Sequence, residues 1–77
     1  MINLKSLADG HCGVVEKIEL NGATKRRLIE MGITPGTKIT VLKRAPLGDP
    51  IEILLRGYSL TIRGTDAEQI QVSEVHA

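Results

Sequence analysis

Cys12 and its neighbour His11 are the residues of this chain best suited to nucleophilic or metal chemistry. A cysteine nucleophile needs a histidine base within reach and a third group to orient that base. Adjacent residues on an extended strand point to opposite faces, however, and the second histidine, His76, lies next to the C-terminus. A closed zinc site takes about four ligands, often in C-x-x-C or H-x-x-x-H pairs, and the chain has neither pair. We therefore predict no catalytic residue and no metal site.

Nucleotide chemistry finds equally little support in the glycine pattern. A phosphate-binding loop of the form G-x-x-x-x-G-K-[ST] is absent, and the eight glycines are dispersed between short segments. We therefore expect no bound cofactor, no GTPase or ATPase activity, and no enzyme activity of any other kind.

Lys25, Arg26 and Arg27 form a basic triplet that could contact phosphates, as in an RNA-binding β-barrel. The formal net charge is only +1, and Tyr58 is the one aromatic residue, whereas single-strand binders stack bases on several rings. These numbers favour a solvated helix face and predict that nucleic acid is not a partner. RNA binding stays open as the weaker alternative.

The composition of the chain limits the kind of protein that it can form. The 77 residues are 42% hydrophobic and 25% charged, which is typical of one small globular domain, here residues 1–77. A single cysteine cannot form an internal disulfide, which fits a reducing compartment. Neither a signal-peptide pattern nor an apolar run of ~18 residues is visible, so we expect a cytoplasmic protein without membrane insertion.

Glycine and proline divide the chain into short segments whose apolar pattern mostly predicts strands. Residues 23–31 lack both and lie between a good N-cap, Asn21, and Gly32, so we predict one short helix there. The T-x-x-E sequence at 65–68 resembles a capping box and predicts about one further helical turn. The predicted strands are residues 14–20, 38–44, 51–56, 59–63 and 70–72. About five antiparallel strands with one short α-helix predict a mainly β fold, a small SH3-like barrel.

Leucines on the outer face of the predicted hairpin are the clearest sign of a binding surface. If the isoleucines of residues 38–44 and 51–56 point inward, Leu42 and Leu54 point outward by strict alternation. Leu47 lies at the tip of the intervening loop, and Arg44 or Lys43 and Arg56 would border the patch. Clustered exposed leucines indicate protein binding. Alternatively, the helix or the segment around Leu4 and Leu7 covers them, and alternation cannot decide between the two.

Two motifs resemble a known family. Residues 27–36, RLIEMGITPG, are similar to the R-L-x-x-(L/M)-G-(I/L/M)-x-P-G signature of the ferrous iron transport protein A (FeoA) family. Residues 45–50, APLGDP, are similar to the loop of that family, and residues 56–63 and 67–72 match its later strands. Ile62 stands where leucine is more usual, and His11 and Cys12 are not part of the signature. The resemblance covers nearly the whole chain.

The resemblance implies an SH3-like, non-enzymatic accessory protein of bacterial ferrous iron uptake. The implied partner is the membrane transporter ferrous iron transport protein B, which carries a cytoplasmic GTP-binding domain. A cytoplasmic location follows, with attachment to the inner membrane only through that transporter. The resemblance does not specify the docking surface, for which outward alternation favours Leu42, Leu47 and Leu54.

The alternative hypothesis is that this protein is a GTPase-activating factor for the same transporter. An inserted arginine can accelerate phosphoryl transfer by orders of magnitude. Arg26, Arg44 and Arg56 are the candidates because each is expected to face solvent, and no residue pattern selects among them.

Overall fold

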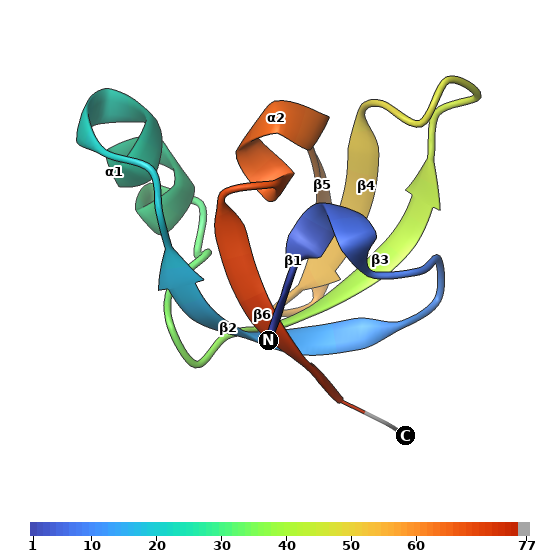
Figure 1. The fold of residues 1–77 in the computed structure, drawn as a ribbon, viewed down its shortest axis with the longest axis horizontal. Helices are drawn as coiled ribbons and strands as arrows, with labels where there is room; N and C mark the ends of the chain where they lie inside the picture. The colour runs from blue at the N-terminus through green and yellow to red at the C-terminus, as the bar shows by residue number, and fades with distance from the viewer. Residues whose placement is uncertain (76–77) are drawn as a thin grey trace.

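A strongly curved sheet of six antiparallel strands makes up most of the computed structural model, which describes residues 1–75 (Figure 1). The strands lie in the order β1-β6-β2-β3-β4-β5. The mainly β fold predicted from the sequence is confirmed. The elements are β1 (Ile2–Asn3), the 3-10 helix η1 (Leu4–Ser6), β2 (Cys12–Ile18), α1 (Gly22–Glu30), β3 (Lys38–Arg44), β4 (Ile51–Leu55), β5 (Tyr58–Ile62), α2 (Gly64–Ala67) and β6 (Ile70–Val75).

The core is built from aliphatic side chains alone. Every strand from β2 to β6 contributes to it, and Leu28 of α1 and Ala67 of α2 complete it from the helices. Each fully buried leucine or isoleucine is worth about 1.5–3 kcal/mol relative to an exposed one. Curving the sheet on itself therefore lets a short chain bury enough apolar surface without aromatic rings.

A β-bulge explains why the buried residues of β2 do not alternate strictly along the strand. Val15 and Ile18 are both buried although they are three residues apart, because the register with β6 shifts between Val15 and Lys17. The additional residue on the bulged strand, Glu16, reverses the inward and outward sides of the strand. The strand also begins earlier than the predicted residue 14, at Cys12.

The N-terminal segment supplies a sixth strand that the sequence pattern did not predict. Ile2 pairs with Val72 of β6, and η1 follows at once, held by the Asn3 side chain, which accepts the Ser6 amide at 3.0 Å. A two-residue strand is too short to show a period. Its main consequence is that Leu4 is fully buried in the core.

The predicted helix is present with Asn21 at its N-cap, but the expected hydrogen bond from the Asn21 side chain does not form. α1 spans Gly22–Glu30. Leu28 is the one buried residue of α1, Thr24 is half-buried, and Met31, just after the helix, packs partly buried against the core. One anchoring side chain is little for a helix of this length, so α1 depends on contacts beyond its own ends.

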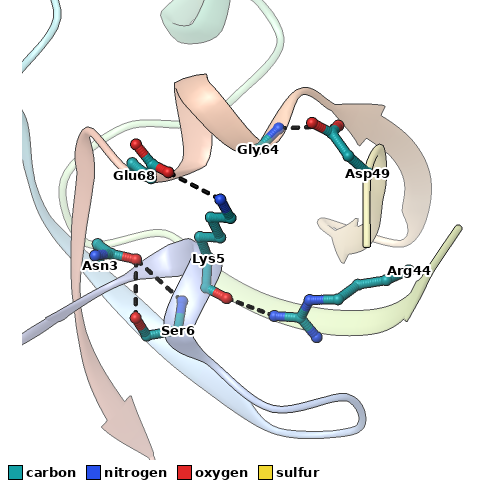
Figure 2. A network of polar contacts seen from close by, with 7 residues as sticks. All are labelled: Asn3, Lys5, Ser6, Arg44, Asp49, Gly64 and Glu68. Atoms are coloured by element: carbon teal, nitrogen blue, oxygen red, sulfur yellow. Dashed lines mark hydrogen bonds and ion pairs between the residues drawn. The ribbon is translucent and has the colours of Figure 1, made fainter. Parts of the chain in front are cut away.

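The second helix begins one residue before the predicted capping box. α2 has Arg63 at its N-cap, without a side-chain cap bond, so the capping box expected at 65–68 does not form. The Gly64 amide instead donates to Asp49 Oδ1 at 3.1 Å, across 15 residues of sequence (Figure 2). A residue of the β3–β4 loop therefore performs the capping.

The turn between β4 and β5 consists of Arg56 and Gly57, both with positive φ. Tyr58 follows this turn and begins β5, one residue before the predicted start of the strand at residue 59. The Tyr58 hydroxyl donates to the Met31 carbonyl, and the ring is 44% exposed. Tyr58 therefore fastens the C-terminal end of α1 to the sheet without entering the core.

We expect Gly32→Ala to lower the free energy of unfolding by about 2 kcal/mol. Gly32 has φ +98°, which costs an L-residue roughly 1–2 kcal/mol, and an added Cβ would lie 3.1 Å from Tyr58 Oη. Gly36 has φ +92° and nothing within 4 Å of an added Cβ, so Gly36→Ala serves as the control for backbone strain alone. Urea unfolding measures both, and equal losses would contradict the crowding at Tyr58.

Candidate functional site

Two leucines lie on the outer face of the β3–β4 hairpin, as the alternation predicts. The side chains of Leu42 and Leu54 are 39% and 38% exposed, whereas Leu4 and Leu7 are buried on the inner side. The segment around Leu4 and Leu7 therefore packs in the core and does not cover the two outer leucines. Leu54 is opposite Thr40, which places Leu42 diagonally across from it on a neighbouring strand.

Leu47 projects from the loop at the far end of the same hairpin, where it is 97% exposed. The loop is nonetheless well held. The Ala45 amide donates to the Pro50 carbonyl at 3.1 Å, and the Gly48 amide donates to the Ala45 carbonyl at 2.7 Å. The Asp49 carboxylate is fixed at Gly64, as described above. An exposed leucine on a hydrogen-bonded loop loses little conformational entropy when a partner covers it. Leu42, Leu47 and Leu54 are called the hairpin surface below.

A shallow pocket of about 350 Å³ lies at the base of this loop. Ala45, Pro46 and Pro50 give it an apolar wall. Lys43 and Glu52, whose charged atoms are 3.7 Å apart, border it on the strands. The pocket lies next to the loop that carries Leu47 and offers room for a partner's apolar side chain.

Arg44, expected at the border of the patch and facing solvent, turns inward instead. The register of β3 against β4 shifts between Val41 and Lys43, so Arg44 comes opposite the buried Ile51. A bulge of this kind re-aims the side chains that follow it. The expectation that Arg44 faces solvent is therefore wrong, since its side chain is only 22% exposed.

Arg44 holds the N-terminal segment to the sheet (Figure 2). Its Nη2 donates to the carbonyl of Lys5 at 2.6 Å and to that of Leu7 at 2.5 Å, and its Nη1 pairs with Asp9. A planar guanidinium can satisfy several acceptors at once, which lysine cannot. No sequence pattern indicated this role, because the acceptors are backbone atoms more than 30 residues away.

Arg56, the other bordering arginine, is exposed but also hydrogen-bonded. Its Nη2 donates to Thr37 Oγ1 at 3.2 Å, and Thr37 in turn donates to the Gly32 carbonyl at 3.2 Å. The side chain therefore stabilises the turn after α1. It lies at the β4–β5 turn, at the opposite end of β4 from Leu47.

The basic triplet is divided among different surroundings. Lys25 is half-buried, Arg26 is exposed, and Arg27 Nη2 lies 3.7 Å from Asp66 Oδ2. Such a spread weakens the expectation of a continuous phosphate-binding patch on the helix.

His11 and Cys12 make separate local contacts. His11 Nδ1 lies 2.6 Å from Glu74 Oε2, and Cys12 Sγ lies 3.6 Å from the Val75 carbonyl. Within residues 1–75, no group of three or more potential metal-ligating side chains is present. His76, the second histidine weighed with His11 and Cys12 in the sequence analysis, lies outside the described residues. No helix in the described range is long and apolar enough to cross a membrane.

Lys5 and Glu68 give a testable pH dependence. The hydrogen bond from Lys5 Nζ to Glu68 Oε1, at 2.8 Å, and the negative charge of Glu68 raise the pKa of Lys5 above its usual 10.5. A raised lysine pKa stabilises the folded state fully below pH 10.5, and this stabilisation is lost as the pH rises through the folded-state pKa. We expect the stability difference between wild type and Lys5→Met to shrink above pH 10.5. Urea unfolding at neutral and alkaline pH measures it, and a constant difference would contradict the pairing.

Comparison with protein-family models identifies a family for this chain. Residues 2–74 match the family model of the FeoA domain. The chain belongs to the FeoA domain family.

A similar protein with a described function supports the assignment to this family. The Fe(2+) transport protein A/Fe(2+) transporter FeoB fusion protein of Porphyromonas gingivalis is 35% identical over 71 residues, which are 92% of this chain and 8% of the fusion protein. The chain thus spans less than a tenth of the length of that relative. The match nevertheless links the FeoA domain to ferrous iron transport and to FeoB on one polypeptide.

Solved FeoA structures share the fold. The solution structure of FeoA from Chlorobium tepidum is 39% identical, with a TM-score of 0.92 over 97% of this chain and 71% of that chain. The zinc complex of Stenotrophomonas maltophilia FeoA, described as a prokaryotic SH3 domain protein, is 25% identical, with a TM-score of 0.82 over 95% of this chain and 91% of that chain. The predicted SH3-like fold is therefore confirmed.

Proposed function

We propose that this FeoA-family chain is a non-enzymatic accessory protein of ferrous iron uptake that binds the cytosolic part of an FeoB-type transporter through the hairpin surface. The observation that carries the proposal is the P. gingivalis fusion, in which an FeoA-related segment and an FeoB transporter share one chain. Fusion keeps two interacting modules at a high effective concentration. An association of the FeoA domain with the transporter requires a surface on that domain that binds the transporter.

The hairpin surface has the properties that such an association needs. Apolar anchors contribute binding energy when a partner excludes water from them. Leu47 is almost fully exposed, and Leu42 and Leu54 retain nearly two fifths of their exposure. The charged border of Lys43 and Glu52 supplies the polar rim common at interfaces.

A GTPase-activating role is the second candidate, and the description of the S. maltophilia protein as a candidate ferrous iron transport activating factor favours it. Among the three arginines considered, Arg44 is held inside and Arg56 is hydrogen-bonded to Thr37. Arg26 is exposed and makes no ion pair within residues 1–75.

We expect this chain to change GTP hydrolysis by the transporter's soluble GTP-binding domain by no more than about twofold at saturation. An arginine finger would accelerate hydrolysis by about 10³ or more, and Arg26→Ala would remove that acceleration. The measurement is single-turnover GTP hydrolysis with and without the chain. A large stimulation lost in Arg26→Ala would establish the second candidate in place of the purely binding role.

A pull-down tests the association itself. The immobilised chain is incubated with detergent-solubilised membranes that carry the FeoB-type transporter of the same organism, and the retained transporter is quantified by blotting. We expect retention above that on an immobilised unrelated SH3-like domain. Equal retention on both would overturn the proposed function.

A further inference from the structure

β5 is the last strand of the sheet, so one of its edges has no strand beside it. Leu55 and Tyr58 close a two-residue turn, and such a turn begins with a hydrogen-bonded pair. Pairs then alternate, so Ser59 and Thr61 direct their backbone N–H and C=O groups away from β4. Within residues 1–75, the backbone of neither residue makes a hydrogen bond to a turn, a loop or another segment on that outer side. The edge therefore presents unused donors and acceptors.

A groove of about 280 Å³ lies between this edge and α1. Met31, which is half-buried, supplies apolar surface to its wall, and the fully buried Leu28 lies beneath it. Its other lining residues include Arg27 of α1, Thr61 of β5, and Arg63 and Asp66 beyond it. An extended peptide beside Thr61 would lie within this groove.

The groove carries an excess of positive charge. Arg27 Nη2 is 3.7 Å from Asp66 Oδ2, and the Arg27 side chain is 56% exposed, so this pair contributes little and opens easily. Arg63 is exposed and makes no ion pair with any residue from 1 to 75. Two arginines against one aspartate favour an acidic occupant.

We propose that this groove, the β5–α1 groove, binds an extended acidic segment of the transporter's cytosolic part as an additional strand on β5. Backbone groups of Ser59 and Thr61 would pair with the segment, as in other cases of strand addition. Arg63 would receive a carboxylate from it. The proposal rests on the proposed function for the source of the segment. It uses the β5 edge and α1 in place of the hairpin leucines, although Thr61 also lines the pocket beside the hairpin loop.

Amide hydrogen exchange tests strand addition without any mutation. The chain is measured alone and saturated with the transporter's soluble cytosolic domain, with NMR readout of single amides. We expect exchange of the Ser59 and Thr61 amides to slow by at least about tenfold on binding, since they gain hydrogen bonds. The Leu60 amide, already bonded to β4, is the internal control. Unchanged Ser59 and Thr61 exchange in a saturated complex would overturn the proposal.

Charge reversal tests the acidic occupant. We expect Arg63→Glu to weaken binding of the same domain by about tenfold or more, since a hydrogen bond to a charged group is typically worth that factor. Lys17→Glu makes the same change of charge on an exposed residue of β2 outside the groove and controls for long-range electrostatics. Equal effects of the two variants would overturn the proposal.

The outcomes separate this inference from the proposed function. Absence of any binding by the wild-type chain refutes both. Binding that depends on Leu47 but not on Arg63 refutes the groove and retains the hairpin surface. Sedimentation of the chain alone checks for a second copy on β5: a dimer that slows the Ser59 and Thr61 amides would show that the edge pairs with itself, and would overturn the proposal.

Discussion

Replacing Arg44 by methionine is expected to lower the free energy of unfolding by about 3 kcal/mol. The guanidinium donates to the carbonyls of Lys5 and Leu7 and pairs with Asp9, and its side chain is only 22% exposed. Hydrogen bonds that involve a charged group are worth about 1.5–3 kcal/mol each, and a carbonyl left without its donor adds a desolvation cost. Methionine keeps the apolar stem and removes all of these bonds. Urea denaturation monitored by circular dichroism measures the loss.

Lys43→Met is the matched control for this prediction. Lys43 is adjacent in sequence, its side chain is 76% exposed, and its partner Glu52 is 3.7 Å away. Exposed pairs of this kind contribute about 0–1 kcal/mol, so the variant should remain near wild-type stability. Arg44→Lys should recover less than half of the loss, because an ammonium lacks the planar fork. Wild-type stability of Arg44→Met would show that the clamp on the N-terminal segment contributes nothing.

Replacing Leu47 and Leu54 together by serine is expected to weaken binding to the transporter's cytosolic domain by about a hundredfold. Covering a leucine that was exposed contributes about 1.5 kcal/mol or more, and two such anchors correspond to roughly two orders of magnitude in Kd. Leu47 is 97% exposed, so its replacement should leave the fold intact, and Leu54 lies on the outer face at 38% exposure. Isothermal titration calorimetry with the soluble domain measures the change.

Ile29→Ser provides the control for lost apolar surface in general. Ile29 is 41% exposed, close to the value for Leu54, and it lies on α1 away from the hairpin. We expect its affinity to stay within about threefold of wild type, since exposed side chains outside an interface contribute little. A folded Leu47/Leu54 double variant that binds as tightly as Ile29→Ser would place the interface elsewhere on the molecule.

The alternation of apolar and polar residues predicted the β3–β4 hairpin correctly. Successive side chains of any extended strand point to opposite faces, so this pattern depends only on neighbouring residues. Residues 38–44 and 51–55 are strands, and Leu42 and Leu54 are exposed on the face that alternation indicates. Gly32 also has the left-handed φ expected after the helix. These features depend only on neighbours within a few residues, so the sequence alone carries them.

The bulge in β3 shows why other features could not be predicted. One additional residue between Val41 and Lys43 exchanges the inward and outward faces for the rest of β3. Arg44 therefore points inward, although strict alternation predicts that it faces solvent. A bulge depends on how a strand meets its partner, which no local pattern records. The cap of α2 by Asp49 and the pairing of β1 with β6 are likewise contacts across long stretches of sequence.

We propose above that this chain binds the cytosolic part of an FeoB-type transporter through the β3–β4 hairpin. An NMR titration of the isotope-labelled chain with the transporter's soluble GTP-binding domain tests it most directly. We predict saturable shifts or broadening that include the amides of Leu42, Leu47 and Leu54, with β1 and η1 unaffected. Spectra that do not change at any concentration of the domain, or changes confined to residues outside the hairpin, would contradict it.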